Sequence, residues 1–255
     1  MFELTHLTWR EVRETARTGI ALLPIGSQEQ HAGHLPMGTD TLLVEAVVDA
    51  ALAELGDDGP GVVRLPSLPF GHSPHHLFAA AVSLSAPTLA AVLADILGSL
   101  AESGFRRILV VNGHGGNDEI MRLAVKRFAL DADVSAAACS YWTVTEGGDD
   151  GENPGATPGH AGWFETSLML AAKPGLVRET DPWQPVDPAP LFDKPPYPGL
   201  TVERHGEWAR VGGTTDDASL ATAEAGRNLL EHRAAGLAGA IRAFDAATAH
   251  SHGNQ

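Results

Sequence analysis

The sequence is poor in several residue types that mark large classes of protein. It has one cysteine, Cys139, in 255 residues, which excludes an internal disulfide framework and fits a reducing compartment. Lysine and arginine number 17 against 32 aspartates and glutamates, for a net charge of −15. Such an acidic chain repels phosphate backbones and anionic headgroups, so we expect neither nucleic acid nor a membrane surface as a partner.

Long apolar runs are also missing. None reaches the length needed to span a bilayer, and residues 1–14 carry charges without the apolar stretch of a signal peptide. We therefore expect a cytoplasmic protein. Hydrophobic residues still make up 44% of the chain and charged residues only 19%, which is ordinary for a globular protein with a sizeable core.

Strand-like and helix-like segments alternate through the first 175 residues. The alternation is typical of βαβ units and predicts an α/β fold on a mostly parallel sheet. Capping residues mark two of the helices, with Thr39 or Asp40 before the first and Ser85 before the second, which Gly104 follows. We expect strands at residues 19–25, 62–68, 80–84, 107–111 and 134–141, and helices at 41–55, 86–103, 118–130 and 162–172.

The character of the chain changes at residues 181–200, which hold seven of the 17 prolines. This density excludes a helix or a central strand. The segment could be a linker, but the rest of the chain offers only one long amphipathic helix, at about residues 218–246, which cannot form a domain alone. We therefore predict one domain over residues 1–255, with a flexible tail from about residue 247.

Histidine is abundant, with 12 residues against one cysteine. Many of the histidines lie close to glycine, proline or serine at the edges of expected loops. Loops at strand ends are where α/β proteins build their sites. The histidines in such positions are His31, His34, His72, His75, His76, His114 and His160.

The densest motif, residues 26–40, directly follows the first expected strand. Glu29 and His31 are two apart, so in an extended segment both side chains point to the same face. Asp40 follows after two glycines and a proline that can fold the loop back. Two carboxylates and an imidazole suit Zn²⁺, Mn²⁺ or Fe²⁺. The alternative is a capping Asp40, a solvated Glu29 and an ordinary loop histidine.

A second motif, NGHGGN at residues 112–117, lies between the clearest strand and a helix. Its glycines permit positive φ angles, and a helix N-terminus favours an anion, so the loop could bind phosphate. It lacks the spacing of the established phosphate-binding motifs. The other interpretations are that His114 is a metal ligand at a strand end, or a histidine hydrogen-bonded within a turn.

The third motif places His160 in a loop and Glu165 early in the next helix. A carboxylate flanked by Phe164 and Leu168 is costly to bury unless it is paired or ligated. The alternative is a surface glutamate that contributes to helix capping. Three loops that offer histidines and carboxylates together favour a site with two metal ions.

In this order and at these distances, E-x-H-x8-D, NGHGGN and H-A-G-x-x-E-T-S resemble the motifs of the creatininase (creatinine amidohydrolase) superfamily. The likeness covers about residues 23–230 and includes GGTTDDASLATAEAG at residues 212–226. It implies a three-layer α/β/α sandwich on a mostly parallel sheet. It also implies a homo-oligomer, often a hexamer in that family.

Carried over by residue, the resemblance implies that Asp40 bridges two divalent ions, either zinc, manganese or iron. Glu29 and His114 would complete the first metal site, and His31 with a further carboxylate the second. Creatininase proper has that carboxylate two residues after the histidine that matches His114. Gly116 stands there in this chain, so the role is expected to pass to Glu165.

The implied activity is hydrolysis of a C–N bond in a small cyclic amide or formamide by a metal-bridging hydroxide, which forms because the two ions lower the pKa of water towards about 7. His160 matches the family's catalytic histidine and would protonate the leaving nitrogen, with Glu165 also taking part. Backbone N–H groups of Gly115 and Gly116 would contact the oxyanion. The residues expected to shape the pocket are His75, His76, Trp142, Trp163 and residues 192–197.

Two differences from relatives bear on the substrate. Gly116 argues against creatinine itself, and His75, where relatives commonly have glutamate, should change what the pocket recognises. Other substrates found in the family are the C-terminal dipeptide of a modified peptide and an oxidised cyclitol.

The alternative from another class is a protein that binds a small molecule or phosphate without catalysis. Such a protein would keep its anion affinity after metal removal. A structural zinc site is disfavoured because such sites use closed Cys/His ligation. Cys139 lies in an apolar run without an activating neighbour, which disfavours it as a nucleophile.

Overall fold

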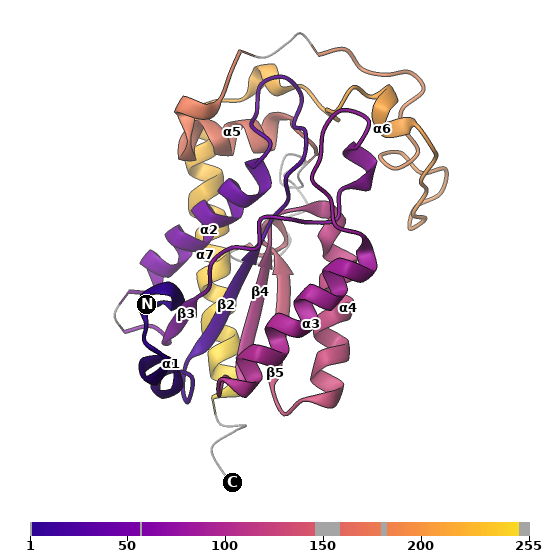
Figure 1. Cartoon of the computed structure of the whole chain (residues 1–255). Coiled ribbons are helices and arrows are strands. Elements are labelled where there is room, and N and C mark those ends of the chain that lie inside the picture. The colour runs from indigo at the N-terminus through magenta and orange to yellow at the C-terminus, as the bar shows by residue number, and fades with distance from the viewer. Residues whose placement is uncertain (1, 57, 146–158, 180–182, 250–255) are drawn as a thin grey trace.

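The computed structural model describes residues 2–56, 58–145, 159–179 and 183–249 (Figure 1). Within them, parallel strands form one sheet in the order β1-β3-β2-β4-β5. The strands are β1 (Phe2–Glu3), β2 (Ile20–Ile25), β3 (Val62–Arg64), β4 (Arg107–Asn112) and β5 (Ser135–Ser140). The α-helices are α1 (Trp9–Thr15), α2 (Thr39–Leu55), α3 (Ala86–Glu102), α4 (Asp118–Asp131), α5 (Trp163–Ala172), α6 (Glu207–Arg210) and α7 (Ala223–Thr248).

Helices cover both faces of the sheet (Figure 1). Alternate residues of the central strands explain the two layers, because successive side chains of a strand point to opposite faces. Leu22 of β2 and Leu109 of β4 face α2, α5 and α7, whereas Leu23 and Val110 face α3 and α4. The chain is therefore a three-layer α/β/α sandwich, and the predicted fold class is confirmed.

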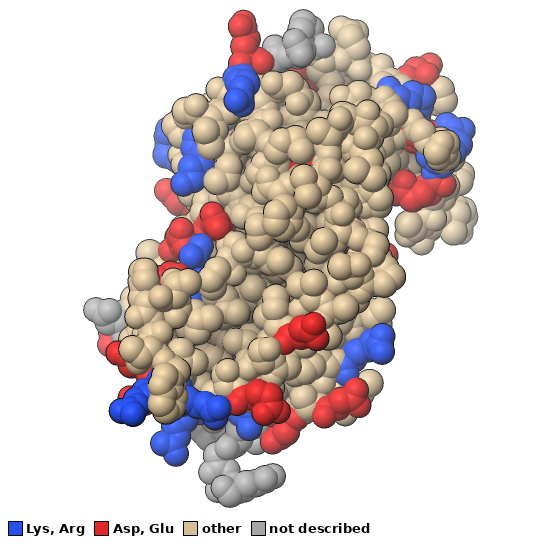
Figure 2. Space-filling model, viewed as in Figure 1, with Lys and Arg blue, Asp and Glu red and all other residues tan. Residues whose placement is uncertain are grey.

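Charged side chains lie mainly around the margin of the face in Figure 2, where basic and acidic ones are neighbours, and the middle of this face is largely uncharged. Within the described part of the chain, no helix is both long and apolar enough to cross a membrane.

Helix α2 begins two residues before its expected start. Its N-cap is Gly38, which offers no side-chain cap, so the prediction that Thr39 or Asp40 caps it was wrong. The physical reason is that both side chains have other partners. Thr39 donates to the carbonyl of Pro36 (2.7 Å), and Asp40 turns towards His31 and His114.

Two expected strands differ from the structure. The strand expected at residues 62–68 ends at Arg64, because Pro66 interrupts it, although Leu68 still bridges Ile25. Residues 80–84 were wrongly expected to form a strand of the sheet. They run antiparallel beside residues 28–30 instead, where Val82 N–H donates to Gln28 (2.8 Å) and Gln30 N–H donates to Ala80 (2.8 Å).

The C-terminal part also shifts. The expected helix at about residues 218–246 begins at Ala223, where the Thr222 side chain caps it by accepting from Ala225 N–H (3.1 Å). It continues to Thr248 through the start of the expected tail, of which residues 250–255 lie outside the described residues. Residues 183–200 contain neither helix nor strand, as their prolines predicted. Three short elements, β1, α1 and α6, were not predicted.

The carboxyl ends of β2 and β4 lie side by side, with Ile25 paired to Asn112. The loops that follow these strands therefore meet at one edge of the sheet. This edge is the usual position of ligand sites in open α/β sheets.

Candidate metal centre

The loop after β2 supplies two fully buried side chains, Glu29 and His31. The loop is tied down by Glu29 N–H, which donates to Met37 (3.0 Å). His31 Nδ1–H donates to the backbone carbonyl of Glu29 (3.1 Å), which leaves Nε2 directed at Asp40 Oδ1 (3.1 Å). A histidine anchored through one ring nitrogen in this way presents the other as a ligand.

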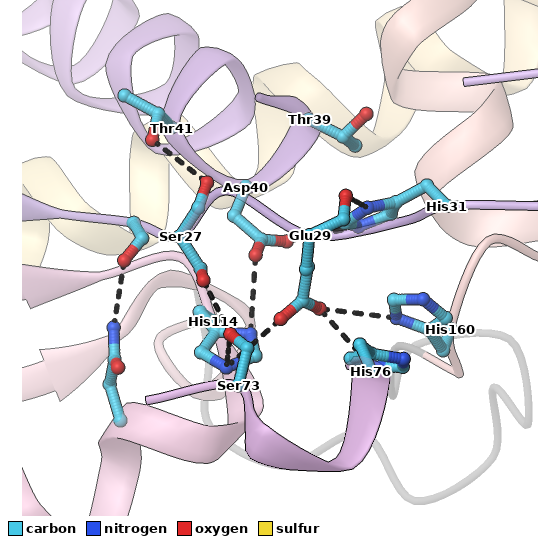
Figure 3. Close-up of polar contacts among 12 residues, drawn as sticks. Ser27, Glu29, His31, Thr39, Asp40, Thr41, Ser73, His76, His114 and His160 are labelled. Carbon is cyan, nitrogen blue, oxygen red and sulfur yellow. Dashed lines mark hydrogen bonds and ion pairs between the residues drawn. The ribbon is translucent and has the colours of Figure 1, made fainter. Parts of the chain in front are cut away.

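Asp40 lies in the first turn of α2 between two imidazoles (Figure 3). Its Oδ1 contacts His31 and its Oδ2 is 3.2 Å from His114 Nδ1. Burial opposes ionisation of this carboxyl, but His31 and His114 outweigh it and hold its pKa well below the usual range. Asp40 is therefore a carboxylate with one oxygen for each of two neighbouring sites.

His114 follows β4 in a turn held by Asn112. The Asn112 side chain accepts from His114 N–H (3.0 Å) and donates to the His114 carbonyl (2.7 Å). A Cβ at Gly113 would lie 2.5 Å from the Asp40 carbonyl, so only glycine lets α2 approach the turn this closely. The His114 ring thereby reaches both Asp40 and Glu29, whose Oε2 is 3.3 Å from Nε2.

His160 and Glu165 flank the start of α5. The backbone of His160 exchanges hydrogen bonds with Thr215, which accepts from His160 N–H through Oγ1 (2.7 Å) and donates its own N–H to the His160 carbonyl (3.0 Å). Glu165 is buried, and its Oε2 accepts from Ala161 N–H (2.6 Å) and lies 3.8 Å from His31 Nε2. The third motif thus reaches the same cluster as the first two.

Glu29 is at the centre of the cluster (Figure 3). Its Oε1 lies 3.3 Å from His76 Nε2 and 3.6 Å from His160 Nδ1, and its Oε2 faces His114. Both of its carboxylate oxygens, and Oδ2 of Asp40, are buried without a hydrogen bond of normal geometry to any described residue. Buried charges of this kind are costly unless paired or ligated to a metal.

The donor set fits divalent metal ions. Ligand atoms of three residues lie within 4.8 Å of one another in several overlapping groups, as a pair of adjacent metal sites requires. These groups are Glu29, His31 and Asp40; His31, His160 and Glu165; Glu29, His75 and His114; and Glu29, His76 and His160.

The imidazoles of the cluster differ in charge preference. Burial disfavours protonation of His31 and His114, but the adjacent carboxylates prevail and raise the pKa of both. For His160, burial and the nearby His31 lower the pKa to about 3, and burial with His114 lowers that of His75 to about 4. His160 and His75 are therefore neutral near pH 7.

A cavity of about 330 Å³ opens above the cluster. The predicted pocket residues Trp142, His75, His76, Gly115 and Gly116 line it, as does Phe192 of the expected segment 192–197. Trp163 packs instead against the core beneath α5, and Tyr197 is exposed.

The prediction missed Trp208, which also lines the cavity. Its ring stacks parallel on Phe192 (centroids 4.1 Å apart) and contacts His75, His76 and His160. Trp208 lies on the four-residue helix α6, far along the chain from the three motifs. Its sequence neighbours are a glycine and charged residues, which indicate a surface turn and give no sign of a ligand site.

Gly116 cannot carry a larger residue in this arrangement. A Cβ there would lie 2.3 Å from the His72 carbonyl and 2.6 Å from His114 Nε2. The carboxylate that the resemblance implies at this position in creatininase proper does not fit here, whereas Glu165 Oε2 lies 3.8 Å from His31 Nε2.

Two alternatives from the sequence find little support. The NGHGGN loop leads into α4, whose first turn carries Asp118 and Glu119, which repel an anion. The Asn117 side chain of this loop accepts from His72 N–H (2.9 Å) and donates to Gly26 (3.0 Å). Cys139 is an unsuitable nucleophile, because burial raises the pKa of its thiol to about 12.

Comparison with known proteins agrees with the geometry. Residues 5–241 match the family model described as creatinine amidohydrolase. The chain is 33% identical to creatinine amidohydrolase of Pseudomonas putida, over 93% of this chain and 95% of that protein. It is 35% identical to the mycofactocin precursor peptide peptidase of Mycobacterium ulcerans (strain Agy99), over 82% and 78%.

A crystal structure of creatinine amidohydrolase (creatininase) superposes with a TM-score of 0.75 at 32% identity, and the match covers 94% of this chain and 96% of that one. The fold, the motifs and the buried donor set all agree with this match. The chain belongs to the creatininase family of hydrolases.

Proposed function

We propose that this protein hydrolyses a C–N bond of a small cyclic amide or formamide with the help of two divalent metal ions. The observation that carries the proposal is a set of three buried carboxylate oxygens, both of Glu29 and Oδ2 of Asp40. They face imidazole nitrogens at 3.2–3.6 Å and lack normal hydrogen bonds within the described residues. Solved creatininases similar to this chain include a manganese form and a Zn-Zn form of a variant.

Asp40 would be shared between the two ions, with Glu29 and His114 on one side and His31 and Glu165 on the other. Zinc, manganese and iron all suit this mixture of nitrogen and oxygen donors. Bound ions of this kind supply Lewis acidity, which polarises a carbonyl and makes water more acidic.

His160 is the proposed proton carrier. Its Nε2–H can donate to the Gln30 carbonyl (2.8 Å), which leaves Nδ1 free near Glu29. Water oxygen bonds to the carbonyl carbon while His160 Nδ1 takes a proton from that water. The C–N bond then breaks with its electron pair going to nitrogen, and His160 returns the proton to that nitrogen. Backbone N–H groups of Gly115 and Gly116, at the cavity wall, would stabilise the oxyanion.

Asp40→Asn tests the proposal. Because the variant loses a charge that faces both metal sites, we expect bound metal, measured by elemental analysis, to fall from about two ions per chain to nearly none. Hydrolysis of a panel of lactams and formamides should be lost with it. Asp95→Asn, on the exposed side of α3, is the matched control and should keep both. Substantial activity in chelator-treated protein would refute the proposal.

Peptide hydrolysis is the second candidate. It is favoured by the similarity to a peptide peptidase and by a second cavity of about 600 Å³ that shares His75, Gly115, Gly116 and Trp208 with the first. A peptide end could extend into that space, which a small lactam would leave empty. Parallel assays with a lactam and formamide panel and with a mixture of short peptides distinguish the two candidates.

The proposal includes the assembly state and domain structure. We expect a homo-oligomer, with a hexamer as the expected size, and a single domain across residues 1–255. Sedimentation of the purified protein measures the size of the oligomer. Limited proteolysis tests the single domain, because two independent domains would yield two stable fragments.

A further inference from the structure

Gln30 lies between two of the proposed metal ligands, and the proposed mechanism uses only its backbone carbonyl. Its side chain is buried, with 7% of its surface exposed. A Cβ at Gly213 would lie 2.1 Å from Gln30 Oε1, so the backbone there packs directly against the amide. A buried, tightly packed amide needs partners for its hydrogen-bonding groups, and these partners define its role.

The orientation of the Gln30 amide follows from one contact. Ala32 N–H can only donate, and it lies 2.9 Å from Oε1, which must therefore be the carbonyl oxygen. The other end of the amide is then the NH₂ group. It lies 2.8 Å from His76 Nδ1 and 3.0 Å from His160 Nε2.

The first consequence concerns His76. An amide NH₂ only donates, so His76 Nδ1 must accept, and a neutral His76 then carries its proton on Nε2. That nitrogen is 3.3 Å from Glu29 Oε1. Gln30 thus makes His76 a donor directed at the carboxylate in the centre of the cluster.

The second consequence concerns His160. Its Nε2 meets two groups of Gln30 with opposite character: the backbone carbonyl at 2.8 Å, which accepts, and the side-chain NH₂ at 3.0 Å, which donates. Both neutral tautomers of His160 therefore find a partner at Nε2. In either tautomer Nε2 keeps a hydrogen bond to Gln30, and Nδ1 stays directed at Glu29 Oε1, 3.6 Å away.

We propose that Gln30 is a positioning residue: its side chain fixes the tautomer of His76, and its two hydrogen-bonding groups anchor His160 in either neutral tautomer. The assignment of His160 as the proton carrier rests on the proposed function, whereas the assignment of the His76 tautomer does not.

Gln30→Glu is the most informative variant, because it keeps the size of the side chain and the acceptor for Ala32 but replaces the donor by a second acceptor. His76 should then move its proton to Nδ1 and stop donating to Glu29. Gln28→Glu, the same change two residues away beside Gly38, is the matched control. Gln30→Leu removes both side-chain partners and shows the effect of losing the amide.

The primary readout is ¹⁵N NMR of histidine side chains in zinc-loaded protein, which distinguishes the two neutral tautomers. We expect the Nε2–H form of His76 in the natural protein and in Gln28→Glu, and the Nδ1–H form in Gln30→Glu. An Nδ1–H form of His76 in the natural protein, or the same tautomer in Gln30→Glu, would overturn the proposal. Bound zinc measured on the same samples tests the metal site separately.

The secondary readout is kinetic. With a hydrolysed amide, Gln30→Glu and Gln30→Leu should lower kcat by about 10- to 100-fold, with KM and melting temperature nearly unchanged. A purely structural role predicts instead that Gln30→Glu keeps full kcat or that both variants melt early. Either result would refute the role of Gln30 towards His160.

Discussion

Two turns of identical sequence bring two histidines of the cluster together. His31-Ala32-Gly33 follows β2 and His160-Ala161-Gly162 precedes α5, and the two imidazoles lie 4.3 Å apart between centroids. In both turns the alanine has a φ of 53°, and in both its N–H donates to a side chain of the site. The backbone geometry is thus shared.

The neighbours of the two rings differ. His31 directs Nε2 at the carboxylate of Asp40 and has Glu165 beyond it, so its pKa is raised. His160 is held at Nε2 by Gln30, and burial lowers its pKa. The same tripeptide therefore presents opposite ring nitrogens, Nε2 of His31 and Nδ1 of His160. In the proposed function the first binds metal and the second carries a proton. The residues that touch each ring, rather than the turn, determine this difference.

The largest effect is expected from His31→Ala. It removes a nitrogen that faces Asp40 and Glu165, so we expect loss of bound metal and a decrease in hydrolysis of about a thousandfold or more. Elemental analysis and a rate assay on the same preparation measure both. His232→Ala, on the exposed side of α7, serves as the control. Full metal content in His31→Ala would show that His31 is not a metal ligand, and the proposed difference in role between His31 and His160 would be wrong.

His160→Ala should have a different effect. The variant removes the proposed proton carrier, and general acid–base groups contribute about 10²–10⁴-fold to rates. We expect a decrease of that size with the metal content retained. If His160→Ala lost as much metal as His31→Ala, both histidines would be ligands and the proton carrier would have to be sought elsewhere.

Gly162→Ala tests how the second turn is anchored. A Cβ at Gly162 would lie 1.1 Å from Asp216 Oδ1, whose carboxylate accepts from Trp163 N–H at the start of α5 (3.3 Å). The new methyl group should push the Asp216 carboxylate away from the start of α5. We expect this to lower the free energy of unfolding by about 1–3 kcal/mol, measured by denaturant titration. Gly98→Ala, in α3 with nothing within 4 Å, should raise it slightly. Equal effects of the two variants would contradict the anchoring role.

The smallest effects are expected from Ala32→Gly and Ala161→Gly. Glycine relieves the strain of the positive φ, which stabilises the folded state by about 1 kcal/mol. It also makes the unfolded chain more flexible, which lowers stability by about 1 kcal/mol, so the two effects on the free energy of unfolding nearly cancel. Ala161 is fully buried and loses a packed methyl group, worth about 0.8 kcal/mol. Ala161→Gly should therefore be less stable than Ala32→Gly in thermal unfolding. The reverse order would show that the strain differs between the turns.

The sandwich and the three motif loops were predictable because the signals are local. The apolar strand at residues 107–112 and the helices after it follow from periodicity, and chemically distinctive residues mark the loops at strand ends. The strand expected at residues 80–84 failed because the segment is apolar but pairs with the loop at residues 28–30, outside the sheet.

The rest of the site depends on contacts between distant segments. Trp208 reaches the cavity from α6, and no pattern near it indicates histidines as its neighbours. The role of Gln30 depends on which atoms of His76 and His160 lie beside its amide. Residue type alone carries no such information, because glutamine is common in loops of every kind.

Gly116 has a consequence for how such a site can evolve. The His72 carbonyl and the His114 ring occupy the space in which a side chain at position 116 would begin. A mutation there to glutamate would meet a backbone atom before it could provide a ligand, while loss of Glu165 alone would leave His31 without its second carboxylate neighbour. Moving the carboxylate from position 165 to position 116 would therefore require the backbone at His72 to shift as well as the two substitutions.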